Sequence, residues 1–182
     1  MKKGKLSSIL LLAALAVAGV AFVVLMAWAF NNSPAVRNLF SGDANEVMGE
    51  VAAGSPASLA ARTRMAAWVS MLIFSVITAL QILAFGIGSV VVRGIRISAD
   101  SVAVKLKQLD NAGIFFDVPL YVGLFGTVSA FLVMTFSPQS SRLIAYSSTL
   151  IGIVFSLLLR LSMQFPLKNR LLAEEENGGQ DK

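Results

Sequence analysis

Four long apolar runs, separated by short polar breaks, dominate the hydrophobic pattern of this chain. They cover roughly residues 7–30, 66–92, 119–136 and 143–163. A helix of about 20 apolar residues is long enough to cross the ~30 Å hydrocarbon core of a bilayer. Because no water is available there, each run must satisfy its own backbone hydrogen bonds as a helix. The pattern therefore predicts an all-α, polytopic membrane protein with four transmembrane helices.

The polar breaks divide the chain into segments with alternating environments. From the N-terminus these are a transmembrane anchor helix (1–30), an external loop with a short helix (31–64), a second transmembrane helix (65–93), a short cytoplasmic segment (94–118), a transmembrane hairpin (119–166) and a cytoplasmic tail (167–182). The tail is polar and acidic, which predicts disorder because it offers little apolar surface to bury. The first run is longer than the roughly 7–15-residue core of a cleaved signal peptide and therefore predicts an uncleaved anchor.

Basic residues beside the spans predict that both termini face the cytoplasm. Lys2, Lys3 and Lys5 precede the first run, and Lys168 and Arg170 follow the last. Cytoplasmic flanks of membrane spans carry an excess of lysine and arginine. Arginines just before the second span oppose this orientation, but the external loop that contains them mixes both signs of charge. Two cytoplasmic termini require an even number of spans, which agrees with four.

Turn and capping signals predict where the shorter helices begin and end. A short helix is expected at about 43–53, and Pro56, capped by Ser55, can start a second helix that runs unbroken into the next span. Ser98 can cap a helix in the cytoplasmic segment, and the Asn-Ala-Gly sequence at 111–113 can end it. That helix is either a solvated or interfacial stub or a subunit-contact helix just inside the membrane.

Composition excludes most catalytic chemistry. The chain of 182 residues is 56% hydrophobic and 14% charged, with no cysteine and no histidine. It therefore has no thiolate nucleophile, imidazole base or Cys/His metal site, and we expect neither an enzyme, a cofactor nor a metal centre. The net charge of +5 comes from basic residues beside the spans, which is typical of a membrane protein in contact with lipid rather than of a nucleic-acid binder.

Small and polar residues recur on one face of the last two spans and inside the second. In lipid, small residues let helices approach closely, and buried polar side chains hydrogen-bond across helices. Glycines on such a face favour packing, whereas a hydroxyl can either line a polar path or bond back to its own helix. Gln81 is interpreted as an interhelical link, with a pore-lining role as the alternative. The residues concerned in the last two spans are Gly123, Gly126, Thr127, Thr149, Gly152 and Ser156. Because only a short turn joins these two spans, they are antiparallel neighbours, and Thr127 and Thr149 are expected within about one helix turn of the same depth.

The hairpin also contains two sequences that resemble a known family. The Gly-Leu-Phe-Gly-Thr-Val sequence at 123–128 resembles the Gly-Leu-Leu-Gly-Thr-Val signature of the MotA/TolQ/ExbB proton-channel family. The Ser-Thr-Leu-Ile-Gly-Ile sequence at 148–153 is similar to the Thr-x-x-Gly segment of that family, and Pro166 and Asn169 are similar to its exit from the membrane. The similarity covers roughly 118–171, which is less than a third of the chain.

The resemblance implies an ion-conducting, stator-like subunit in a bacterial-type inner membrane. Family members form homo-oligomeric rings, pentamers around a dimer of a single-span partner, and proton or sodium flow past an aspartate on that partner drives work. The residues that match the family threonines are Thr127 and Thr149, which would line the contact with the partner helix. The cytoplasmic segment is much shorter than is usual in the family, which leaves a non-conducting membrane scaffold or assembly subunit as the alternative.

Two ionisable residues lie near the inner ends of the hairpin helices. Asp117 precedes the third apolar run, and Arg160 lies near the end of the fourth. An ionisable residue within a span is a functional candidate by default. One interpretation gives Asp117 a role as the carboxylate at the inner mouth of an ion path. In the other, Arg160 extends to the lipid headgroups and pairs with Asp117.

Overall fold

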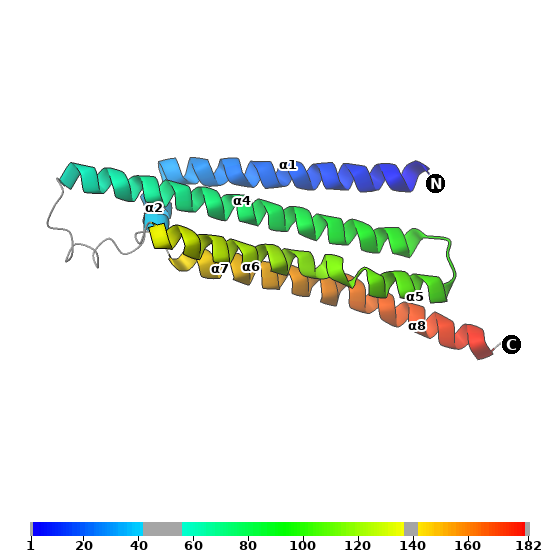
Figure 1. Ribbon diagram of the computed structural model, residues 1–182. Helices are drawn as coiled ribbons and strands as arrows, with labels where there is room; N and C mark the ends of the chain where they lie inside the picture. The colour runs from blue at the N-terminus through cyan, green and yellow to red at the C-terminus, as the bar shows by residue number, and fades with distance from the viewer. Residues whose placement is uncertain (1, 42–55, 137–141, 181–182) are drawn as a thin grey trace.

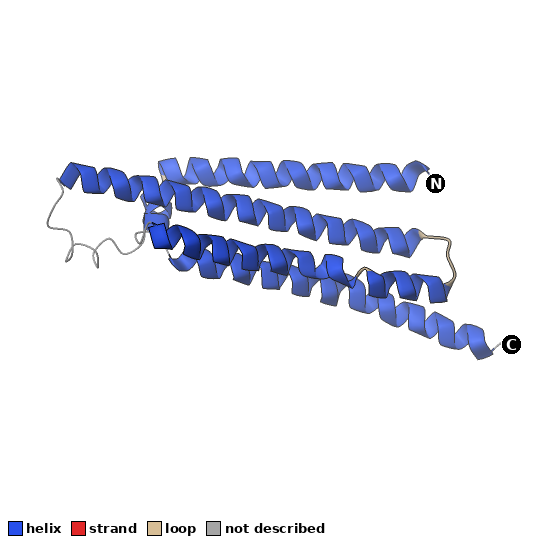
Figure 2. Cartoon of the chain, viewed as in Figure 1, coloured by secondary structure: helices blue, strands red, loops and turns tan. Residues whose placement is uncertain are grey.

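A computed structural model describes residues 2–41, 56–136 and 142–180 of the chain (Figure 1). Within these ranges the chain forms helices and no strand (Figure 2). The helices are α1 (Lys2–Asn32), α2 (Pro34–Ser41), α4 (Pro56–Ile97), α5 (Val102–Asn111), α6 (Gly113–Phe136), α7 (Arg142–Leu159) and α8 (Phe165–Gln180), with a π-helical segment (Arg160–Gln164) between α7 and α8.

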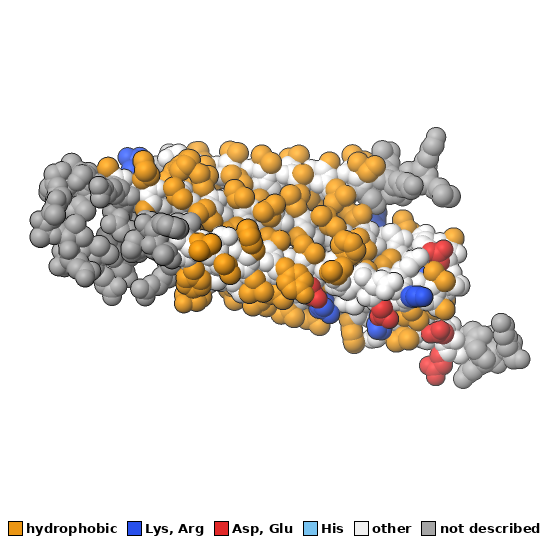
Figure 3. Space-filling view, viewed as in Figure 1, with side chains coloured by type: hydrophobic (Ala, Val, Ile, Leu, Met, Phe, Trp, Pro, Cys, Tyr) orange, Lys and Arg blue, Asp and Glu red, His pale blue; other side chains and the backbone are white. Residues whose placement is uncertain are grey.

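Four stretches of these helices are long and apolar enough to cross a membrane, which confirms the predicted all-α, four-span architecture. They are Ile9–Asn32, Arg64–Ile97, Val102–Leu132 and Ala145–Asn177. Apolar side chains cover the length of the bundle, and charged side chains gather where α5 and α8 project from it (Figure 3). Exposed apolar surface of this extent suits contact with acyl chains rather than with water. The chain is therefore a multi-pass membrane protein.

The bundle consists of a three-helix core and one peripheral helix. Helices α4, α6 and α7 pack against one another, whereas α1 lies along α4 on the other side (Figure 1). Each of these two helices contributes a glycine to their contact. Gly19 of α1 lies beside Ala79 of α4, and Gly86 of α4 lies beside Leu15 of α1. The beginning of α1 and the end of α8 lie at the same end of the bundle (Figure 1), as an even number of spans requires.

Two helices extend well beyond a bilayer. At about 1.5 Å per residue, the 42 residues of α4 measure about 63 Å, roughly twice the hydrocarbon thickness. α4 begins at Pro56 and runs unbroken through the second span, as predicted. The chain from α7 to α8 is also continuous, because the π-helical segment joins the two. Both helical stretches thus continue beyond the length that a span requires.

Helices α5 and α8 form a small apolar core at the end of the bundle near the termini. Leu109 of α5 is fully buried against Leu167 and Leu171 of α8, together with Val92 and Ile95 of α4. An ion pair between Lys168 and Asp110, at 2.9 Å, closes the edge of this contact. Burial of these leucines gives the C-terminal segment the apolar contacts that its own composition lacks.

The structure differs from the sequence prediction in three local features. Most of the tail 167–182, predicted as disordered, belongs to helix α8, because its leucines pack on α5. Ser101 rather than Ser98 is the N-cap of α5, and the Ser98 hydroxyl instead donates to Asp100 at 2.5 Å. Helix α6 begins at Gly113, inside the segment 94–118 that was predicted to precede the hairpin. The short helix expected at 43–53 lies outside the described residues.

The contact between α5 and α8 predicts the effect of truncating Leu109. We expect Leu109→Ala to destabilise the protein by about 2–5 kcal/mol, because it removes a fully buried side chain and leaves a cavity. Thermal unfolding of the purified chain in detergent measures this. Leu172→Ala on the exposed side of α8 is the control and should leave the midpoint nearly unchanged. Equal midpoints for both variants would contradict the packing of α8 described above.

Candidate functional site

The three core helices meet most closely around Gln81. Its side chain is fully buried, and Nε2 donates a hydrogen bond to the backbone carbonyl of Ser148 on α7, at 2.8 Å. A β-carbon on Gly123 would lie 2.8 Å from both partners of this bond. A β-carbon on Gly152 would lie 2.7 Å from the carbonyl of Pro119. Both glycines are therefore required for the close approach, and Gln81 links α4 to α7 there, as the sequence indicated.

Ser148 extends this contact into the α6/α7 hairpin. Its hydroxyl is fully buried and donates to the carbonyl of Gly123 at 3.2 Å. Gly126 lies on the same side, where a β-carbon would be 2.8 Å from the Ile77 side chain of α4. The sequence did not single out Ser148, because its position beside Thr149 does not reveal which of the two hydroxyls faces α4.

Thr127 and Thr149 meet between α6 and α7, at the common depth predicted for them. Their hydroxyls are in direct hydrogen-bond contact, and both residues are half-buried. The Thr127 hydroxyl also lies 3.1 Å from the carbonyl of Gly123 in its own helix and 2.9 Å from that of Ala145 in α7. The two threonines therefore form one polar pair in the seam of the hairpin, with Thr127 also in contact with backbone carbonyls.

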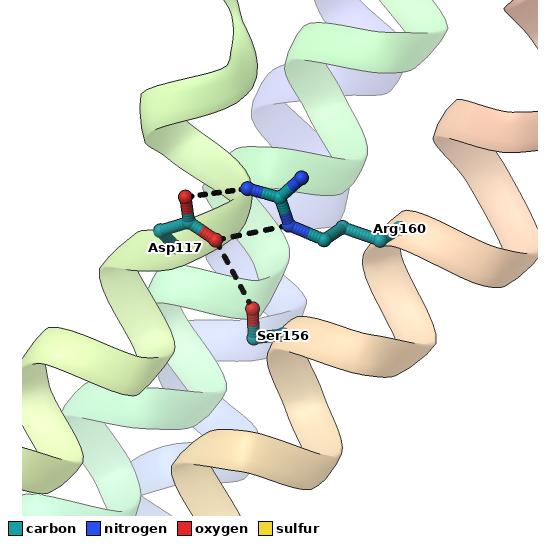
Figure 4. Close-up of polar contacts among 3 residues, drawn as sticks. All are labelled: Asp117, Ser156 and Arg160. Atoms are coloured by element: carbon teal, nitrogen blue, oxygen red, sulfur yellow. Dashed lines mark hydrogen bonds and ion pairs between the residues drawn. The ribbon is translucent and has the colours of Figure 1, made fainter.

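A second polar cluster lies in the same seam, nearer the termini. Asp117 on α6 forms a two-point ion pair with Arg160, with Nε 3.0 Å from Oδ1 and Nη2 2.5 Å from Oδ2 (Figure 4). The hydroxyl of Ser156 donates to Oδ1 of Asp117 at 3.3 Å. The Arg160 and Asp117 side chains are 43% and 24% exposed. The ion pair between Asp117 and Arg160 considered in the sequence analysis thus forms, and the Ser156 hydroxyl bonds to the same carboxylate.

Local backbone irregularities flank this cluster on both helices. Pro119, two residues after Asp117, lies inside α6 and cannot donate a backbone hydrogen bond there. On α7, Arg160 is the first residue of the π-helical segment, and its carbonyl accepts from the amide of Phe165 five residues later. Short π-helical segments occur frequently at functional sites. The ion pair therefore lies where both helices depart from regular hydrogen bonding.

The predicted site residues thus fall into two clusters along one seam. Thr127 and Thr149 form the cluster nearer mid-membrane, beside the packing contacts of Gln81, Gly123, Gly126 and Gly152, whereas Asp117 and Ser156 form the cluster nearer the termini. Among the described residues no group of three or more acidic side chains could hold a metal ion. The arrangement offers hydroxyls, carbonyls and one paired carboxylate, which can carry protons or coordinate water.

Comparison with known proteins adds no relative: the chain matches no protein-family model, and no curated protein or solved structure is significantly similar to it.

The contact at Gly152 predicts opposite effects for two glycine substitutions. Gly152→Ala should lower the thermal unfolding midpoint, because its β-carbon would lie 2.7 Å from a backbone carbonyl that cannot move aside. Gly94→Ala is the matched control on α4. It meets no atom within 4 Å and should leave stability unchanged or raise it by up to about 1 kcal/mol through helix propensity. A Gly152→Ala midpoint at or above that of the Gly94→Ala protein would disprove the tight three-helix contact.

Proposed function

We propose that this chain is the ion-conducting, stator-like subunit of an energising complex in a bacterial-type inner membrane, with the proton as the conducted ion. The subunit couples the ion gradient to work through a single-span partner that carries an aspartate. The supporting observation is the Thr127–Thr149 pair, which is half-buried in the α6/α7 seam at the positions that match the family threonines. In this proposal both termini face the cytoplasm, and the subunits form a ring, as in the family.

The seam provides polar groups at two depths of the membrane. From the threonine pair to the cluster of Asp117, Ser156 and Arg160, hydroxyl, carbonyl and carboxylate oxygens recur between α6 and α7. A proton or hydrated ion requires such groups because transfer of a charge into hydrocarbon costs several kcal/mol or more. Thr127 and Thr149 would form the contact for the partner, and Asp117 the mouth near the termini.

The ionisable group at mid-membrane would come from the partner. Among the described residues, Asp117 is the only carboxylate between Arg64 and Ile97 or between Asp110 and Leu171. It is already bonded to Arg160 near the end of the seam. An aspartate on a neighbouring helix could instead accept hydrogen bonds from the two threonine hydroxyls. Thr127 and Thr149 are only half-buried on the hairpin, so part of each residue remains open to a further helix.

The threonine pair predicts a loss of conduction when its hydroxyls are removed. Thr127→Val and Thr149→Val retain the side-chain shape and remove the polar group. We expect proton flux to fall at least about tenfold, since a barrier higher by about 1.4 kcal/mol already has this effect. The measurement is dye-detected proton flux into vesicles that contain the complex purified from native membranes. Thr127→Ser and Thr149→Ser retain a hydroxyl and serve as position-matched controls with flux near the original.

The alternative is a scaffold whose polar residues only pack helices. The contacts of Gly123 and Gly152 favour it, as do the backbone carbonyls near the Thr127 hydroxyl. In a scaffold, both valine variants would assemble and retain whatever flux the original complex has, whereas bulky residues at Gly123 or Gly126 would disrupt the oligomer. Full flux in both valine variants would therefore remove the ion-path proposal and leave the scaffold.

The Asp117–Arg160 pair predicts a combined effect on flux and stability. Asp117→Asn removes the charge that neutralises Arg160, so we expect lower flux together with a lower unfolding midpoint. Asp110→Asn is the matched control, because it breaks the exposed ion pair with Lys168, whose contribution to stability is at most about 1 kcal/mol. Unchanged flux with reduced stability in Asp117→Asn would restrict Asp117 to a structural role.

A further inference from the structure

Helix α4 carries three buried polar atoms without a hydrogen-bond partner within the described residues. They are Oγ of Ser70, Oγ1 of Thr78 and Oε1 of Gln81. The exposed fractions of these residues are 3%, 5% and 0%. At about 100° and 1.5 Å per residue, the three side chains fall within about 80° around the helix and extend over about 16 Å of its length. They therefore lie on one side of α4 in the interior of the protein, together with the apolar side chains of Phe74 and Ile77.

Other hydroxyls of the same helix do not share this feature. Ser75 donates to the carbonyl of Met71 at 2.8 Å, and Ser89 donates to that of Phe85 at 2.9 Å. Bonding to the carbonyl four residues earlier is the usual way in which a serine or threonine in a membrane helix is satisfied. Ser70 and Thr78 do not use it, so their hydroxyls are available to another group. The second amide atom of Gln81 is available in the same way.

An unpaired polar atom is costly inside a membrane protein, because neither acyl chains nor apolar side chains can replace the lost hydrogen bond. Water can do so where two or more polar atoms lie within its reach. Side chains three residues apart on a helix have β-carbons about 5–6 Å apart, which is a separation that one water molecule bridges. Thr78 and Gln81 have this spacing. Ser70 lies two turns earlier and is separated from Thr78 by Phe74, which packs on Phe40 of α2.

The direction of this side of α4 follows from its neighbours. Phe85, two turns beyond Thr78 on the same side of α4, contacts Phe155 of α7 with ring centroids 5.4 Å apart. Ile77, about 20° from Ser70 around the helix, faces Gly126 of α6. The polar atoms are thus directed toward the hairpin of α6 and α7.

We propose that Thr78 and Gln81 of α4 hold a bound water molecule inside the subunit. This site adjoins the threonine pair, because Gln81 bonds to the Ser148 carbonyl and the Ser148 and Thr127 hydroxyls both reach the carbonyl of Gly123. Bound water on α4 stands independently of ion conduction, whereas its use in an ion path rests on the proposed function.

The absence of cysteine from the chain allows a direct test with silver ion as the probe. Single variants Ser70→Cys and Thr78→Cys are purified as the full chain, exposed to silver nitrate in the folded state, then unfolded and titrated for remaining thiol. A thiol beside water ionises and reacts, whereas burial in an apolar surrounding raises its pKa and lowers the reactive fraction about tenfold for each unit.

We expect Thr78→Cys to react at least about tenfold faster than Ser70→Cys, which lies beyond Phe74, and than two further controls, since a pKa shift of one unit suffices for this. Val76→Cys lies on the outer, lipid-facing side of α4, and Ala84→Cys is buried one turn beyond Gln81. Reaction of Thr78→Cys as slowly as Val76→Cys would overturn the proposal.

Thr78→Val keeps the proposal testable if the cysteine variants do not fold. If the Thr78 hydroxyl holds water, its removal lowers the unfolding midpoint, because Gln81 then loses its bridged partner. If the hydroxyl is dry and unpaired, the same substitution raises the midpoint, and this result would refute the bound water. Fast silver reaction of Thr78→Cys combined with full proton flux in Thr127→Val and Thr149→Val would retain the bound water and reject only ion conduction.

Discussion

The close approach of α4, α6 and α7 around Gln81 is the constraint on which the rest of the structure depends. Gly123 and Gly152 allow the helices to meet so closely that a β-carbon at either position would strike a backbone carbonyl. The amide of Gln81 then reaches the carbonyl of Ser148. In lipid, apolar surface gives helices no preference for one another over acyl chains, so close packing and interhelical hydrogen bonds must hold the bundle together. Because this contact fixes the rotation of α6 and α7, it also determines which of their polar residues face each other.

That rotation separates two kinds of polar residue in the hairpin. Ser148 faces α4 and is fully buried, whereas Thr149 turns toward Thr127 in the half-exposed seam. Further along the same seam, the Asp117 carboxylate accepts hydrogen bonds from Ser156 and Arg160. A polar group in a membrane is costly wherever it is not paired, and the seam provides partners at both depths. Its remaining exposure makes it the surface at which a further helix would complete an ion path, while the proposed water site of α4 lies inside the subunit.

The sequence predicted the four spans because the length of an apolar run is a direct requirement of the bilayer. It also predicted the common depth of Thr127 and Thr149, since a short turn fixes the register of an antiparallel hairpin. It was wrong about the tail, because the leucines of α8 are too few to order that segment alone and their partner, Leu109, lies in a different segment. Sequence spacing also cannot distinguish Ser75, which bonds to its own helix, from Thr78, which does not, because that choice depends on side-chain orientation.

An electron cryo-microscopy structure of the complex isolated from native membranes through this subunit tests the central claim most directly. The account predicts a ring of copies around at least one additional single-span helix, with a carboxylate of that helix at the depth of Thr127 and Thr149 and facing their seam. A structure in which the seam faces acyl chains in every copy, with no further helix beside it, would contradict the account.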